Sequence, residues 1–131
     1  MTVFCTYCSA HKAPTPTPLP AIKRYHSARI DAVAAQAAAN AYPLYILSGK
    51  FGLLAAEAPV PYYDYLLTAD SVSQHAQLVA QQLAAIGIEQ LIFFARPEEH
   101  DPGAQPYVAC VQLACTTAGV AFELRYEEFS A

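Results

Sequence analysis

Short apolar runs alternate with longer segments of helical periodicity along this chain. The apolar runs, which predict strands, are residues 2–5, 44–47, 91–95 and 120–126. The periodic segments, which predict helices, are residues 21–41, 71–86 and 106–118. Strands that alternate with helices form a parallel sheet whose faces the helices cover, with right-handed crossovers. The pattern therefore predicts a single α/β domain over residues 1–131. We expect three layers, with a four-stranded, mostly parallel sheet flanked by helices.

Proline marks the segments that are predicted as loops. Residues 8–20 contain the run Pro14-Thr15-Pro16-Thr17-Pro18-Leu19-Pro20. Proline lacks the N–H that a helix needs, and it restricts the residue before it to extended backbone. This segment is therefore predicted as a stiff surface excursion. Residues 51–61 include Pro59 and Pro61 and are predicted as a loop rather than a regular element.

Composition narrows the class of function. The 131 residues are 55% hydrophobic and 14% charged, which favours one compact globular domain. A net charge of −4 gives no basic footprint, so no duplex nucleic acid partner is predicted. The chain has no apolar run of about 18 residues and no signal-peptide pattern, so we predict no membrane association. We expect a cytoplasmic protein with reduced thiols. The sequence predicts no oligomeric state.

The pair Cys5 and Cys8, in the string C-T-Y-C, has three interpretations. The first is a redox site, but a proline-rich loop follows here instead of the helix that lowers the thiol pKa in thioredoxin-like proteins. The second is a zinc site in which His11 joins the two cysteines, with a fourth ligand from His26, Cys110 or Cys115. The third, which we favour, makes Cys5, Cys110 and Cys115 small buried hydrophobes. We therefore predict no metal and no cofactor, and we expect a functional role only for Cys8, at a strand end.

Polar groups gather where the first two predicted strands end. Cys8, Ser9 and Lys12 follow the first strand, and the string Ser48-Gly49-Lys50-Phe51-Gly52 follows the second. Open α/β sheets bind ligands in the crevice beyond the carboxyl ends of their strands. Because the first two strands should be neighbours, we expect these groups to share one small-molecule site.

The string at residues 48–52 suggests an anion site. Gly49 and Gly52 allow backbone N–H groups to approach a phosphate or carboxylate, and Lys50 adds charge. The string is not the Walker pattern, which needs G-x-x-x-x-G-K-[ST]. A tight turn with a solvated lysine is the alternative interpretation.

An acid among aromatic residues follows the glycine string. Asp64 is flanked by Tyr62, Tyr63 and Tyr65 and is a candidate general base or ribose ligand. A helix cap or an aromatic packing corner is the alternative. Tyr25 and Arg29 lie four residues apart on one face of the first predicted helix and are candidates for the same crevice. For Arg29 we favour the alternative of a solvated helix surface.

Together these residues resemble a known family. The chain has Cys8-Ser9-x-x-Lys12, then Tyr25 and Arg29, then residues 45–54 reading Y-I-L-S-G-K-F-G-L-L, then Pro61-Tyr62-x-Asp64. This set resembles a widespread uncharacterised family of bacteria and phages with the signature L-S-[AG]-K-[YF]-G-L-L followed by P-Y-D. It is also distantly similar to the YaaA peroxide-stress proteins. An extra tyrosine separates Tyr62 from Asp64, so either Tyr62 or Tyr63 matches the aromatic residue of the signature.

The candidate site predicts a small-molecule partner that bears a phosphate or resembles a nucleobase. The first hypothesis is a protein that binds a nucleotide or nucleobase-like metabolite and hydrolyses or transfers at a glycosidic bond. Its candidate catalytic residues are Asp64 and Ser48. The alternative is a non-catalytic binding module of a stress or phage-related system. The candidate ligand-binding residues are Cys8, Ser9, Lys12, Tyr25, Arg29, Ser48, Gly49, Lys50, Gly52, Tyr62 and Tyr63.

Overall fold

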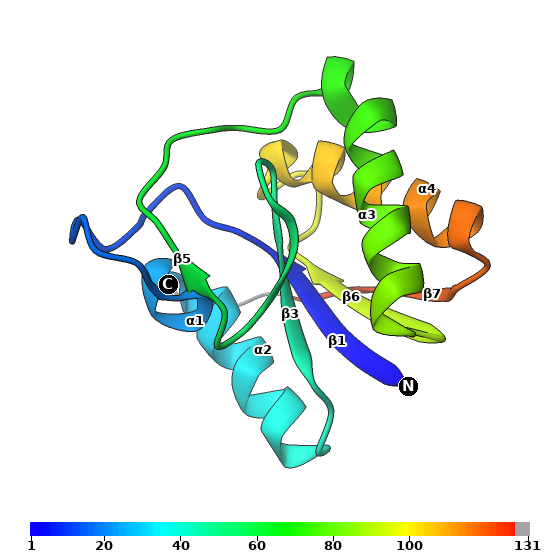
Figure 1. The fold of residues 1–131 in the computed structure, drawn as a ribbon, viewed down its shortest axis with the longest axis horizontal. Coiled ribbons are helices and arrows are strands. Elements are labelled where there is room, and N and C mark those ends of the chain that lie inside the picture. The colour runs from blue at the N-terminus through cyan, green and yellow to red at the C-terminus, as the bar shows by residue number, and fades with distance from the viewer. Residues whose placement is uncertain (128–131) are drawn as a thin grey trace.

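The computed structural model describes residues 1–127 and has a central sheet that is mostly parallel (Figure 1). The spatial order of the strands is β4 (Gly52–Ala55), β3 (Leu44–Ser48), β1 (Thr2–Tyr7), β6 (Gln90–Ala95) and β7 (Ala121–Tyr126). Strand β4 is antiparallel to β3, and the other neighbouring pairs are parallel. The predicted α/β class and parallel sheet are confirmed.

Helices cover both faces of the sheet. Helix α2 (Ala28–Ala39) contributes Val33 and Ala37 to one apolar cluster, which also holds Phe4 of β1. Helices α3 (Val72–Ile86) and α4 (Gln105–Ala118) pack against each other and join the larger cluster with Val3 and Cys5 of β1. Since successive residues of a strand point to opposite faces, β1 is buried on both sides.

The predicted helix over residues 21–41 is divided in two. Helix α1 (Ala21–Arg24) stops before Tyr25, whose backbone is extended and forms an antiparallel bridge with Lys12. Helix α2 then starts after Ser27, whose side chain accepts a hydrogen bond from the Ile30 N–H at 3.3 Å. Serine is favoured just before the first residue of a helix, so Ser27 explains why α2 begins here. The high alanine content of residues 21–41 made the segment look like one continuous helix.

The prediction of a loop over residues 51–61 is wrong in part. Strand β4 pairs with β3 through a tight hairpin in which Ser48 lies opposite Gly52, and so the sheet has a fifth strand. Farther along, β5 (Pro59–Val60) pairs with β2 (Leu19–Pro20) in a small antiparallel sheet. Proline is tolerated in these short strands because they have few ladder hydrogen bonds to lose.

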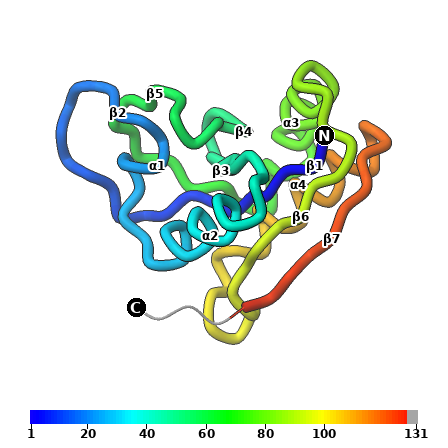
Figure 2. The backbone as a smooth tube through the Cα atoms, turned by 90° about the horizontal axis from the view of Figure 1, so that it is seen from below, coloured from blue at the N-terminus to red at the C-terminus, as the bar shows by residue number. Residues whose placement is uncertain are grey.

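The proline-rich loop forms a lobe with α1, β2 and β5 at one end of the molecule (Figure 2). Its anchor is Arg24, whose side chain is fully buried. The guanidinium donates to the carbonyl oxygens of Ala13 (2.6 Å), Thr15 (2.8 Å), Thr17 (2.6 Å) and Val60 (3.2 Å). The Arg24 guanidinium therefore supplies hydrogen-bond donors to the carbonyl groups of this segment, because its prolines have no N–H to donate to a neighbouring strand.

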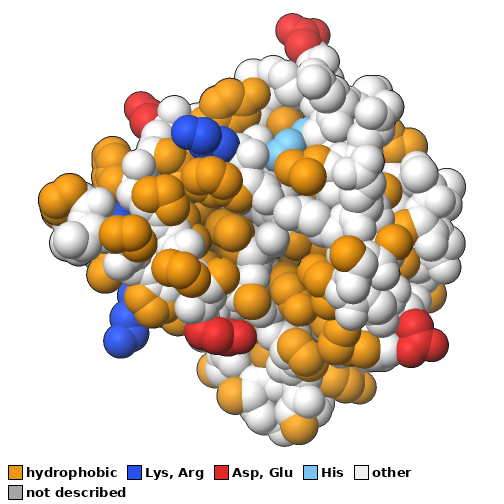
Figure 3. All heavy atoms as spheres, viewed as in Figure 1, with side chains coloured by type: hydrophobic (Ala, Val, Ile, Leu, Met, Phe, Trp, Pro, Cys, Tyr) orange, Lys and Arg blue, Asp and Glu red, His pale blue; other side chains and the backbone are white. Residues whose placement is uncertain are grey.

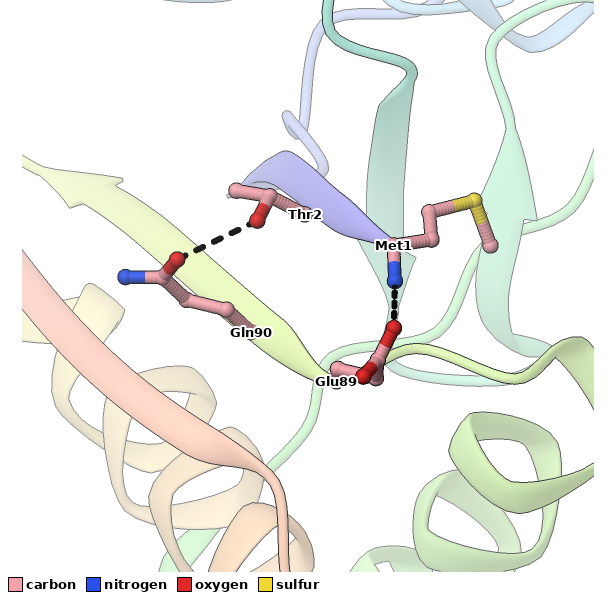
Figure 4. A network of polar contacts seen from close by, with 4 residues as sticks. All are labelled: Met1, Thr2, Glu89 and Gln90. Atoms are coloured by element: carbon pink, nitrogen blue, oxygen red, sulfur yellow. Dashed lines mark hydrogen bonds and ion pairs between the residues drawn. The ribbon is translucent and has the colours of Figure 1, made fainter.

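The remaining short elements lead into α3 and α4. A 3-10 turn, η1 (Ala69–Ser71), precedes α3, and η2 (Pro102–Ala104) precedes α4. At the amino ends of the strands, Thr2 Oγ1 donates to Gln90 Oε1 at 3.1 Å, and the Met1 amino group pairs with Glu89 (Figure 4). These contacts fix the start of β1 against β6. Within residues 1–127, no helix has both the length and the apolarity needed to cross a bilayer.

Replacement of Arg24 by methionine should destabilise the protein by about 3 kcal/mol, because buried carbonyl groups lose a charged donor. Urea unfolding of Arg24→Met beside wild type measures this. Lys23→Met is the matched control, since Lys23 is exposed on the same short helix and should change stability by less than about 0.5 kcal/mol. Equal effects of the two substitutions would contradict the anchoring role of Arg24.

Candidate functional site

A cavity of about 300 Å³ lies at the carboxyl ends of β1 and β6. From β1 the chain passes through α2 to β3 on one side, and later returns to β6 on the other side of β1. The strand order therefore reverses between β1 and β6. Open α/β sheets bind ligands at such a topological switch point. We call this space the switch-point cavity.

Two stacked tyrosine rings form part of the cavity wall. Tyr7 of β1 and Tyr107 of α4 have ring centroids 5.9 Å apart at an interplanar angle of 29°. The Tyr7 hydroxyl donates to Asp101 Oδ2 at 2.7 Å. Burial raises the pKa of Tyr7 to about 12, so this phenol stays protonated at neutral pH. The pair presents aromatic surface and a fixed carboxylate to the cavity.

Arg29 anchors the end of β1 and lines the same cavity. Its Nη1 donates to Thr6 Oγ1 and to the Tyr7 carbonyl, both at 2.6 Å, and Nη2 donates to the Cys8 carbonyl at 3.2 Å. The guanidinium carbon lies 3.5 Å from the Tyr7 ring centroid. The side chain is only 6% exposed, and burial lowers the pKa of Arg29. The interpretation of Arg29 as a solvated helix residue is therefore wrong.

Lys12 lies beside a chain of buried hydroxyl groups. Its Nζ is 4.9 Å from the Tyr63 ring centroid and 5.9 Å from that of Tyr25. The two tyrosine hydroxyls hydrogen-bond each other, and Tyr63 also bonds Ser48 Oγ at 2.8 Å. Burial raises the pKa of Tyr25 to about 12 and also raises the pKa of Tyr63. Both phenols are thus neutral donors and acceptors that tie the loop after β5 to the sheet.

The two tyrosines before Asp64 differ in burial. Tyr63 is 6% exposed and joins the hydroxyl chain, whereas Tyr62 is 53% exposed. Tyr63 therefore occupies the position that packs against the L-S-G-K-F-G-L-L string. Asp64 is exposed, and it lines the switch-point cavity next to Tyr65.

The segment over residues 64–66 stands between two buried anchors. Tyr63 on one side is held by Ser48, and Leu67 on the other side donates its N–H to Tyr107 Oη at 3.2 Å. Figure 1 shows the whole connection from β5 to α3 as a long arc. In the space-filling view, hydrophobic side chains are dense on the left of the molecule, which is the side where this connection begins (Figure 3). The mouth of the cavity is thus exposed but fixed at both ends.

Ser48 organises the β3–β4 turn. Its Oγ accepts hydrogen bonds from the N–H groups of Lys50 and Phe51, each at 3.1 Å. The Ser48 carbonyl bonds His75 Nε2 at 2.8 Å. The Ser48 side chain is fully buried, and the N–H groups of Lys50 and Phe51 are both hydrogen-bonded to it. The segment thus has the form of a tight turn, which was the alternative to an anion site. Lys50 is exposed at its tip.

Gln82 of α3 locks the other side of this turn. Its Oε1 accepts from the Leu53 N–H at 2.7 Å and its Nε2 donates to the Phe51 carbonyl at 3.0 Å. Gly52 has a φ of 74°, and a Cβ there would collide with Gln82 Oε1. Gly52 thus serves the hairpin in two ways, by its backbone conformation and by its lack of a side chain.

The structure divides the predicted site residues among two spaces and a group that lines neither space. Cys8, Ser9, Lys12, Arg29 and Asp64 line the switch-point cavity. Gly49 and Lys50 line a second space of about 490 Å³ beside α3, which we call the α3 groove. The predicted site residues that line neither are Tyr25, Ser48, Gly52, Tyr62 and Tyr63.

The sequence did not reveal the wall formed by the end of β1, the loop after β6 and helix α4. Tyr7, Asp101 and Tyr107 line the cavity, although they are far apart in the sequence. Asp101 lies in a polar loop after the third predicted strand, which is the kind of signal that points to a strand-end site. What the sequence did not show is that β6 lies directly beside β1.

The four cysteines are free and buried. Burial raises the pKa of Cys110 and of Cys115 to about 12 and raises that of Cys5 well above its usual value, as expected of small buried hydrophobes. Cys8 differs because it lines the cavity, with Sγ 3.7 Å from Tyr107 Oη. Residues 1–127 contain no group of three or more His, Cys, Asp or Glu side chains placed to hold a metal ion.

Fold and cavity together define an open α/β protein with a ligand-sized cavity at its topological switch point. The chain belongs to DUF6884, a family of unknown function, whose family model matches residues 3–114. This match spans every residue that lines the switch-point cavity and the α3 groove. Neither a curated protein nor a solved structure matches the chain.

Gly52→Ala should destabilise the protein more than Gly87→Ala does. Gly87 has a similar φ of 84° but open space where the methyl group of alanine would stand, so it reports the backbone strain alone, about 1 kcal/mol. Gly52→Ala adds the loss of the Gln82 hydrogen bonds, for a total of about 3 kcal/mol. Urea unfolding of both variants measures the difference. Equal losses would mean that the Gln82 contact does not support the hairpin.

Proposed function

We propose that this protein binds a nucleotide or nucleobase-like metabolite in the switch-point cavity. The observation that carries the proposal is the gathering of aromatic rings, cations and carboxylates around one cavity at the strand reversal. Sites for small molecules are typically apolar concave spaces with a few placed polar groups. This cavity has that composition.

The aromatic side of the cavity suits a planar base. Tyr65 is 46% exposed at the mouth and has ring surface available to a base, whereas Tyr7 and Tyr107 stack on each other as the buried wall behind it. Aromatic faces stack with heterocyclic bases of every kind. Asp101, held by the Tyr7 hydroxyl, and Asp64 are acceptors for the N–H groups on a base edge or for ribose hydroxyls.

The cationic side suits a phosphate. Lys12 and Arg29 both line the cavity, and the hydrogen bonds of Arg29 to Thr6, Tyr7 and Cys8 all go to neutral oxygens. The nearby Asp101 carboxylate interacts electrostatically with this guanidinium, so only part of the charge of Arg29 is available to attract an anion. Lys12 is partly exposed and supplies the mobile ammonium that a phosphate would contact directly.

We infer further that the bound ligand carries a glycosidic bond, at which the protein catalyses hydrolysis or transfer. Asp64 is the candidate general base, because its carboxylate is exposed at the cavity mouth while Asp101 is engaged by Tyr7. Ser48 is buried behind Tyr63 and supports the wall from which Asp64 projects. A protein that binds the ligand without turnover would instead be a recognition module.

Calorimetric titration with a panel of nucleosides, mononucleotides, free bases and ribose 5-phosphate tests the binding proposal. We expect at least one mononucleotide to bind, with affinity reduced about tenfold in Lys12→Ala, equal to about 1.4 kcal/mol. Lys23→Ala is the matched control and should bind as wild type does. Failure of the whole panel to bind would overturn the proposal.

Asp64→Asn separates catalysis from recognition for the panel member that binds. The substitution keeps the shape of the side chain and removes the base, so turnover should fall by about a hundredfold or more while affinity stays within a few fold. Release of free base, followed by chromatography, measures turnover. If wild type releases no base from any bound ligand, the protein is a binding module.

A further inference from the structure

The switch-point cavity and the α3 groove share a wall. Tyr65 lines both spaces, while Leu66 lines the cavity and Leu67 lines the groove. The Leu67 N–H donates to Tyr107 Oη at 3.2 Å, which joins the groove side of the wall to the cavity side. The two spaces therefore adjoin each other at Tyr65, which is exposed.

Gly49 allows the turn after β3 to approach this wall closely. A Cβ on Gly49 would lie 3.0 Å from the Leu67 nitrogen and 3.0 Å from Tyr107 Oη, which is tighter than ordinary packing allows. The next residue, Lys50, is exposed and lines the groove. The close approach thus places Lys50, a cation that lines the groove, directly after the residue at which the turn meets this wall.

The groove has the chemistry of a site for a second polar unit. Gln74, Gln77 and Gln81 follow each other at helical spacing on one face of α3. Carboxamides both donate and accept, which suits sugar hydroxyls and base edges. Leu78 is 37% exposed and adds apolar surface beside them. Among the described residues, none that lines the groove is acidic, so Lys50 has no competing carboxylate in that lining.

We propose that the ligand is bipartite, of the dinucleotide class, an inference that rests on the proposed function. One nucleoside occupies the switch-point cavity, the phosphate bridge crosses Tyr65 beside Lys50, and the second nucleoside lies along the glutamine face of α3. A mononucleotide fills one of two adjoining spaces, of about 300 and 490 Å³, and leaves the other to water. The net charge of −4 and the sparse positive charge of the groove argue against a longer polynucleotide.

Calorimetry with two matched probes tests this inference. The probes are the mononucleotide that binds best and its 5′,5′-linked dinucleoside diphosphate. We expect the dinucleotide to bind wild type at least tenfold more tightly. The double variant Gln77→Ala/Gln81→Ala should remove that advantage without changing the affinity of the mononucleotide. Both positions are exposed on a helix, where alanine is well tolerated. Gln112→Ala, an exposed glutamine on α4, is the matched control and should retain the full advantage.

The outcomes separate the two proposals. Equal affinity of the two probes, or an advantage that survives the double variant, overturns the bipartite ligand and leaves the proposed function standing. Absence of binding by both probes overturns both. Tyr65→Ala gives an independent check, because loss of the shared ring should weaken both probes, and an unchanged affinity of the dinucleotide would contradict its path across the wall.

Discussion

The guanidinium group of Arg29 holds the carboxyl end of β1, and the switch-point cavity depends on that end. A buried cation is costly unless its N–H groups find acceptors. Here Thr6, Tyr7 and Cys8 supply three oxygens within 3.2 Å, and the Tyr7 ring lies against the guanidinium face. The strand end is thereby fixed where regular pairing stops. Tyr7 in turn positions Tyr107 by stacking and Asp101 by its hydroxyl.

Buried tyrosine hydroxyls fix the rest of the cavity wall. Tyr63 joins Tyr25 and Ser48, and Tyr107 accepts from the Leu67 backbone. These bonds hold the arc between β5 and α3 at two points, and they leave the exposed residues 64–66 projecting over the cavity. Burial raises the pKa of each of these phenols, so they remain uncharged hydrogen-bonding groups across the physiological range. A cavity whose entrance is exposed and whose wall is held by buried hydrogen bonds has the geometry expected of a preorganised binding site.

The sequence predicted the parallel sheet because buried strands such as residues 91–95 are apolar throughout and alternate with periodic helices. It also identified Cys8 and Lys12 as candidate site residues because they follow a predicted strand, and Asp64 because it is an acid among tyrosines. Arg29 was a candidate only from its spacing to Tyr25 on a predicted helix. It did not predict β4, because Leu53-Leu54 lacks the alternation of a half-buried strand and its pairing depends on Gln82, some thirty residues away. Nor did it predict the burial of Arg24 and Arg29, whose acceptors are mostly backbone carbonyls that leave no trace in the side-chain pattern.

We propose a ligand site where the strand order reverses, between β1 and β6. The most direct measurement is the change of backbone amide chemical shifts during titration of the isotope-labelled protein with the best-binding mononucleotide. We predict that the largest changes cluster at Tyr7, Cys8, Asp101 and Tyr107. Largest changes at the opposite end of the sheet, around Glu89 and Gln90, would contradict this placement of the site.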